Sequence, residues 1–225
     1  MVAPGGCAAT HTTVHVAGDT VRTTVTARGD VVRRWVRVTR GRLRRSAGGE
    51  EARVVVGIGV QWTSPSGALP AGVEPRPCTL QLCAAGGRCL VFQLSRAGPA
   101  VPALLRRFLA DGGVTFAGYN VAADCRKLRA HHGLEVASAM ELRRASGMGD
   151  ASMEEMAAAL LGVRAGGAAK PGKTARDDWG AAKLSKKQVR YAVVDAYLSY
   201  RLGAHLIVHG AAGGGNVGTN HVVVA

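Results

Sequence analysis

The segment from Val54 to Trp62, with the sequence VVVGIGVQW, decides the fold class. It has the length of a buried strand, and apolar β-branched residues dominate it. Two further strand patterns follow it, CTLQLCA at 78–84 and RCLVFQL at 88–94, and a Gly86-Gly87 turn joins them. The three segments predict an antiparallel meander.

Helical and strand patterns alternate after the meander. A short strand is predicted at 114–117, and a further strand is expected to begin near residue 139. Predicted helices cover 99–109, 121–132, the stretch from Ser152 to Leu161, and 186–207. Strands in front with alternating helices behind them indicate an α/β fold, a mixed sheet with helices on its faces.

The segment before this meander predicts a hairpin and a basic helix. His15-Val16 and 21–27 are rich in β-branched residues and flank Gly18-Asp19, which is typical of a hairpin. Asp30 is a candidate N-cap for a basic helix from about 31 to 40, followed by a basic loop. The predicted organisation is a flexible tail at 1–12, the hairpin and basic helix at 13–50, the α/β domain at 51–208 and a Gly-rich disordered tail at 209–225.

Charge and cysteine usage narrow the class of protein. The 225 residues carry a formal net charge of +14, which favours a polyanionic partner, most simply DNA or RNA. An Arg-rich chain without such a partner remains the alternative. The five cysteines are odd in number and form no CxxC pair, so we expect reduced thiols in a cytosolic or nuclear protein.

Two observations bear on location. The N-terminal stretch has no basic region followed by an apolar core, and no apolar run has the length of a membrane span, so no membrane partner is expected. The basic run at 40–45 is compatible with a nuclear address. The expected localisation is the nucleus, the cytoplasm or both.

Three polar residues are candidates for catalytic or metal-binding roles. Tyr191 and Asp195 are four residues apart on the last predicted helix and therefore lie on one face of it. Asp124 lies in the helical segment AADCRKL and could face the same site. Cleavage of a phosphodiester by two metal ions needs such carboxylates, because hard cations prefer oxygen ligands. Taken singly, each residue has another explanation: a solvated helix acid, a core tyrosine, or an acid paired with Arg190 or Arg201.

Taken in order, these segments resemble the 3′–5′ exonuclease domain of the Werner-syndrome type, which belongs to the DEDDy subgroup of the ribonuclease H-like superfamily. The small plant members without a helicase look most similar. The segments that carry the resemblance are VVGIGVQW, CTLQLC, GYNVAADCRKL, the Asp178-Trp179 pair before LSKKQ, and YAVVDAYLSYRL. The resemblance implies a ribonuclease H-like mixed sheet and Mg²⁺ or Mn²⁺ as cofactor. It also implies Asp124 and Asp195 as metal ligands and Tyr191 as the residue that orients the attacking water.

The first acidic motif departs from the family pattern. The family places Asp-x-Glu at the tip of the first strand, and this chain has Gly59 and Gln61 there, before Trp62. The number of carboxylates at the site therefore falls from four to two, and loss of a metal's supporting groups costs metal affinity or activity. The sequence predicts a nucleic-acid-binding member of this family with impaired catalysis. The alternatives are an active two-metal-ion 3′–5′ exonuclease, with Mg²⁺ or Mn²⁺, and a non-catalytic interaction subunit with a protein partner or a second copy of itself.

A set of basic side chains on predicted helices and loops is expected to contact the nucleic acid. Lys and Arg provide most of such affinity through the phosphate backbone. The candidates are Arg33, Arg37, Arg40, Arg126, Lys127, Lys173, Lys186 and Lys187.

Overall fold

A single mixed sheet organises the chain. The computed structural model describes residues 8–46, 54–63, 75–98, 101–163, 174 and 177–210. Its seven-stranded sheet has the order β1-β2-β5-β4-β3-β6-β7. The strands are β1 (Thr10–Val16), β2 (Asp19–Thr26), β3 (Val54–Gln61), β4 (Thr79–Ala84), β5 (Arg88–Phe92), β6 (Val114–Gly118) and β7 (Ala139–Glu141).

The meander is confirmed. Strand β3 pairs antiparallel with β4, and β4 pairs antiparallel with β5, while β6 and β7 extend the sheet in parallel from β3. Gly86 and Gly87 both have positive φ angles in the β4–β5 turn, a conformation that suits glycine. The register places Cys83 opposite Cys89, and these two form a disulfide, so the expectation of reduced thiols is wrong for this pair.

The N-terminal hairpin belongs to the same sheet. Strands β1 and β2 are antiparallel around Ala17 and Gly18, and β2 pairs in parallel with β5. Strand β1 begins at Thr10, inside the range expected to be a tail. Its first residue already pairs with Val25, because β-branched threonines suit a strand. The phenol of Tyr197 and the guanidinium of Arg201 both donate to Asp19, which ties the hairpin to the C-terminal helix.

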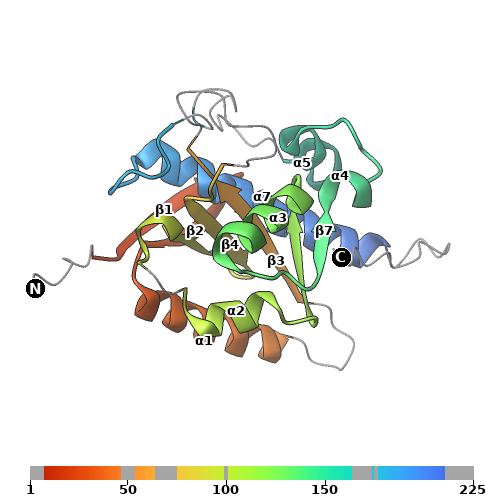
Figure 1. The fold of residues 1–225 in the computed structure, drawn as a ribbon. Helices are drawn as coiled ribbons and strands as arrows, with labels where there is room; N and C mark the ends of the chain where they lie inside the picture. The colour runs from red at the N-terminus through yellow and green to blue at the C-terminus, as the bar shows by residue number, and fades with distance from the viewer. Residues whose placement is uncertain are drawn as a thin grey trace, which may run out of the picture.

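Helices cover both faces of the sheet. They are α1 (Gly29–Ser46), α2 (Ala103–Leu109), α3 (Val121–His132), α4 (Leu142–Ala145), α5 (Met153–Leu161) and α7 (Lys186–Gly210), with a 3-10 turn η1 (Leu94–Arg96). Figure 1 shows α1 and α2 along one face and α7 across the other, near α4 and α5. Helix α1 continues through Arg42–Arg45, where a loop was expected, because Leu43 is buried and extends its apolar face.

Two glycines let α7 lie close against the sheet. A Cβ atom on Gly57 of β3 would lie 2.0 Å from the carbonyl oxygen of Ala196, and one on Gly203 of α7 would lie 2.4 Å from Cβ of Ala117. No other residue type fits these two positions without moving the helix. The close packing places α7, and the polar residues on its inner face, directly over β3.

Two sets of expectations concern parts of the chain outside the described residues: the tails, at 1–7 and 211–225, and the contact of Lys173 with nucleic acid. Among the described helices, none combines the length and apolar character needed to cross a bilayer.

Candidate active site

The site is centred on Asp195, which α7 presents to the end of β3. A Cβ atom on Gly59 would lie 2.7 Å from Oδ2 of Asp195 and 3.2 Å from Oε1 of Gln81. Gln61, two residues further along the same face of β3, donates its Nε2–H to Oδ2 of Asp195 at 3.4 Å. The two positions that depart from the family pattern therefore both lie beside Asp195.

Asp124 is brought to the same site by α3. Its side chain is buried, so the alternative explanation of Asp124 as a solvated helix acid is wrong. Burial raises the pKa of Asp124 well above its usual value, and the negative charge of Asp195 raises it further. The charge of Lys127 and the backbone N–H of Val60 lower it. The effect of Asp195 on Asp124 means that the fold places the two aspartates near one another.

Tyr191 lies one turn before Asp195 on α7. Its ring centroid is 5.9 Å from that of Trp179, which is fully buried. Burial, followed by the charges of Asp195 and Glu154, raises the pKa of Tyr191 to about 12. The phenol therefore stays protonated at neutral pH and can donate a hydrogen bond.

The turn before α7 is fixed to the end of β3. Thr63 donates its hydroxyl to Oδ1 of Asp178 at 3.0 Å, and Gln188 donates to the carbonyl oxygen of Asp178 at 2.8 Å. Ser185 caps α7 by accepting from the backbone N–H of Gln188 at 3.2 Å. These bonds hold the first turns of α7, and hence Tyr191 and Asp195, in register with β3.

The charge state of Asp195 follows from its surroundings. Burial raises its pKa to about 7, and the nearby charge of Glu154 adds to the rise. Such a raised pKa is typical of acids that share a poorly solvated site. The rise favours the protonated carboxyl near neutral pH.

Glu154 and Gln81 were not found from the sequence. Glu154 lies in the first turn of α5, and its charge acts on both Asp195 and Tyr191. Gln81 is opposite Gly59 in the β3–β4 register, and its Oε1 is buried without a hydrogen-bond partner. The capping box of Ser152 and Glu155 marks the start of α5 in the sequence, but nothing local shows that α5 packs against α7.

The sequence was also compared with known protein families. The family model described as 3′–5′ exonuclease matches residues 69–208. The chain belongs to the 3′–5′ exonuclease family. The family match begins after β3, so it does not include Gly59 and Gln61.

Two relatives are similar to this chain over only part of their own length. The chain is 29% identical over 164 residues to exonuclease 3′-5′ domain-containing protein 2 of Mus musculus, covering 68% of this chain and 24% of that protein. It is 27% identical over 166 residues to a 3′-5′ exonuclease of Arabidopsis thaliana, covering 68% and 52%. The chain therefore spans only about a quarter and about half of these two relatives.

A solved structure shows the same fold. RNase D of Escherichia coli, described as an exoribonuclease involved in structured RNA processing, superposes with a TM-score of 0.64 at 15% identity, covering 84% of this chain and 45% of that one. The expected ribonuclease H-like architecture is confirmed at the level of the α/β fold.

The residues present do not fit the two-metal centre that the family resemblance implies. Gly59 has no side chain, and the amide NH₂ of Gln61 points to Asp195 rather than offering an oxygen. In the described part of the chain, no three His, Cys, Asp or Glu side chains are grouped so as to hold a metal ion. Two carboxylates, Asp124 and Asp195, are fewer than a pair of divalent ions needs as a clamp.

The basic side chains expected to contact nucleic acid differ in their surroundings. Arg33 and Arg37 on α1, Arg126 on α3, and Lys186 and Lys187 on α7 are exposed. Arg40 makes an ion pair with Asp111 at 3.4 Å. Lys127 is buried, and its Nζ lies 4.0 Å from the ring centroid of Trp62, so the expectation of a surface cation is corrected at this position.

Proposed function

We propose that this chain is a nucleic-acid-binding member of the 3′–5′ exonuclease family, of the Werner type, in which phosphodiester hydrolysis is impaired. The observation that supports this most strongly is the contact between Asp195 and the β3 tip. The carboxylate lies over Gly59 and accepts a hydrogen bond from Gln61. Asp195 therefore occupies the space that an acid at residue 59 would need, and it faces an amide N–H where an acid at residue 61 would offer an oxygen to a metal.

What remains of the site can still position substrate. Tyr191 keeps its hydroxyl proton at neutral pH and can donate to a phosphate oxygen or to a water molecule. A protonated Asp195 can do the same, because its pKa is raised to about 7. These groups can orient a 3′ end, but they do not supply the positive charge that stabilises the transition state of phosphoryl transfer.

The charge of the molecule supports a nucleic-acid ligand. The formal net charge is +14, and exposed cations such as Arg33, Arg126 and Lys186 lie on three different helices. Such a distribution favours DNA or RNA backbones over a neutral partner. A protein with this ligand is expected in the nucleus, the cytoplasm or both.

One experiment tests binding and impairment together. The purified protein is incubated with end-labelled DNA and RNA in Mg²⁺ or Mn²⁺, beside the variant Gly59→Asp/Gln61→Glu, and binding of the same oligonucleotides is measured in EDTA. We expect wild type to bind with an affinity that falls steeply with salt, and to degrade 3′ ends far more slowly than the variant. Asp195→Ala in the variant background should abolish the gained activity.

Three results would contradict the proposal in different ways. Wild-type degradation as fast as that of the variant, abolished by Asp195→Ala, would establish an active exonuclease. Absence of salt-dependent binding, with a protein that co-purifies after nuclease treatment, would favour an interaction subunit. An inactive variant that is folded and binds Mn²⁺ would show that impairment has a cause other than Gly59 and Gln61.

A further inference from the structure

A cavity of about 450 Å³ lies between α1 and the strands β1, β2 and β5. Its walls come from segments far apart in the sequence, the N-terminal hairpin, the basic helix and the middle of the meander. The residues that matter here are Arg22 on β2, Arg34 on α1, Arg88 on β5, and the apolar group Val31, Trp35 and Val38 on α1. Its size is within the range of small-ligand sites in proteins.

Three arginines from different elements line this cavity. In the described ranges, no carboxylate forms an ion pair with Arg22, Arg34 or Arg88. The Nε of Arg88 is buried and has no hydrogen-bond partner. Burial lowers the pKa of Arg88, and the charges of Arg42 and Arg22 lower it further. A partly buried arginine among other arginines is unfavourable unless an anion joins them.

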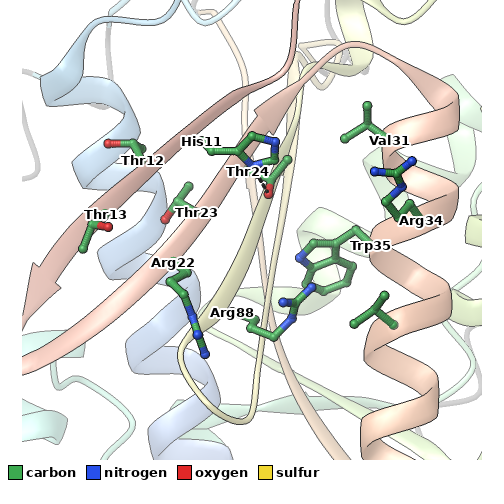
Figure 2. Close-up of a pocket in the computed structure, with 11 residues that line it drawn as sticks. His11, Thr12, Thr13, Arg22, Thr23, Thr24, Val31, Arg34, Trp35 and Arg88 are labelled. Atoms are coloured by element: carbon green, nitrogen blue, oxygen red, sulfur yellow. Dashed lines mark hydrogen bonds between the residues drawn. The ribbon is translucent and has the colours of Figure 1, made fainter.

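The remaining wall of the cavity is apolar. Figure 2 shows Trp35 pointing from α1 toward the strands, with Arg88 pointing toward it from β5. Val38 is 38% exposed, which makes it one of two large apolar side chains exposed among the described residues. Thr13, Thr24 and His11 line the strand side, and Oγ1 of Thr24 lies 3.2 Å from Nδ1 of His11. A cluster of arginines beside an apolar surface suits a ligand with both a phosphate and a flat ring.

We propose that this cavity, the α1 pocket, binds one nucleotide of a single-stranded nucleic acid, with its phosphate on Arg22, Arg34 and Arg88 and its base against Val31, Trp35 and Val38. A single strand is required because bases in a duplex are stacked and paired, and cannot reach an apolar wall. The proposal rests on the nucleic-acid binding proposed above, and it names where a strand is held.

The α1 pocket is separate from the candidate active site. Arg22, Thr24 and Arg88 project from the sheet toward α1, whereas Gly59 faces α7 on the opposite side. Valines that alternate with the pocket residues along β2, such as Val21 and Val25, pack on the α7 side. A strand in this pocket is therefore held independently of Asp124 and Asp195, so the pocket can retain nucleic acid in a protein with impaired hydrolysis.

Fluorescence polarisation with short fluorescein-labelled oligodeoxythymidylate and oligouridylate tests the α1 pocket. The variant Arg22→Gln/Arg34→Gln removes two exposed pocket cations, and Arg107→Gln/Arg144→Gln removes two exposed cations, one on α2 and one on α4, that do not line the pocket. The pocket variant should bind about tenfold or more weakly at 0.1 M salt, and its salt slope should fall by about 0.7 for each lost phosphate contact. The control variant should lose less than about threefold.

A second pair of variants tests the apolar wall. Val38→Glu places a negative charge at the pocket, and Val208→Glu places the same charge at an exposed position near the end of α7. We expect a loss of binding only with Val38→Glu, while thermal unfolding stays near that of wild type for all four variants.

The possible results distinguish failure of the pocket proposal from failure of the proposed nucleic-acid binding. If wild type binds and the pocket double variant loses no more affinity than the control double variant, the pocket assignment is wrong but nucleic-acid binding stands. If a duplex of the same sequence binds as tightly as the single strand and is equally sensitive to the pocket variant, the single-strand assignment fails. If wild type binds neither oligonucleotide, the pocket proposal and the proposed function both fail.

Discussion

Oδ2 of Asp195 lies 2.7 Å from the position that a Cβ atom on Gly59 would occupy. A normal side chain at residue 59 could not exist beside Asp195 in this rotamer. The contact is made by the far end of a side chain, so a larger residue would displace the carboxylate rather than the helix. Glycine at residue 59 and the inward rotamer of Asp195 are therefore two parts of one local arrangement.

Restoring the first-motif acids should make stability depend on a divalent cation. The variant Gly59→Asp/Gln61→Glu adds two carboxylates beside Asp124 and Asp195, and unpaired like charges repel in a poorly solvated site. In EDTA, we expect its melting temperature to fall below that of wild type, and Mn²⁺ should raise it by mass action. Differential scanning fluorimetry with and without Mn²⁺ measures both effects.

The single variant Gly59→Asn, with Gln61 kept, is the control, because its side chains have the same size as those of Gly59→Asp/Gln61→Glu but carry no new charge. A Mn²⁺-dependent rise of equal size in this control would contradict a role for the restored carboxylates.

The stability of wild type should fall as pH rises from about 4 to about 7. The folded protein holds a proton on Asp195, whose pKa is raised to about 7, while the unfolded chain has already lost it near pH 4. The folded state therefore binds more protons in this window, and the free energy of unfolding decreases with pH. Asp195→Asn should be more stable than wild type above pH 7, by on the order of 2 to 4 kcal/mol.

Urea unfolding at several pH values, in EDTA, measures this difference. Asp150→Asn, at an exposed position, serves as the matched control. A constant difference between Asp195→Asn and wild type across the pH range would contradict the assignment of the proton to Asp195.

Removing the charge of Lys127 should affect stability rather than nucleic-acid binding. Lys127→Met keeps the apolar stem but loses the contact of the ammonium group with Trp62 at 4.0 Å, a loss of about 1–2 kcal/mol. The pKa of Asp124 should rise further, because Lys127 lowers it. Oligonucleotide affinity should stay near that of wild type, whereas Lys186→Met, at an exposed position, should weaken it. The reverse order of the two affinities would show that Lys127 reaches the ligand.

Gly57→Ala should be strongly destabilising. Its methyl group would lie 2.0 Å from the carbonyl oxygen of Ala196 and 2.5 Å from the backbone nitrogen of Tyr200, so α7 would have to move. We expect a cost of more than about 3 kcal/mol, measured by urea unfolding. Gly112→Ala, where a Cβ atom meets nothing within 4 Å, should change stability by less than about 1 kcal/mol. Equal effects of the two variants would mean that α7 adapts without cost.

Much of the site could be predicted because its residues lie in local patterns. The spacing of Tyr191 and Asp195 on one helix face, and the start of α3 at Val121, depend only on helix periodicity. The contributions of Glu154 and Gln81 could not be predicted, because they depend on α5 packing against α7 and on the β3–β4 register. Lys127 was misjudged because a lysine on a basic helix is usually solvated, and only the packing of α3 against Trp62 shows otherwise.

The sequence by itself determined the meander, the helix that carries Asp124, the helix that carries Tyr191 and Asp195, and the absence of side-chain acids at Gly59 and Gln61. These follow from periodicity and residue type, which act over a few neighbouring residues. Only the tertiary structure decided that Asp195 lies over Gly59 and accepts a hydrogen bond from Gln61, and that Arg22, Arg34 and Arg88 line one pocket. The reason is physical: strand order and helix packing bring together residues more than sixty or a hundred positions apart, and local patterns carry no information on such distances.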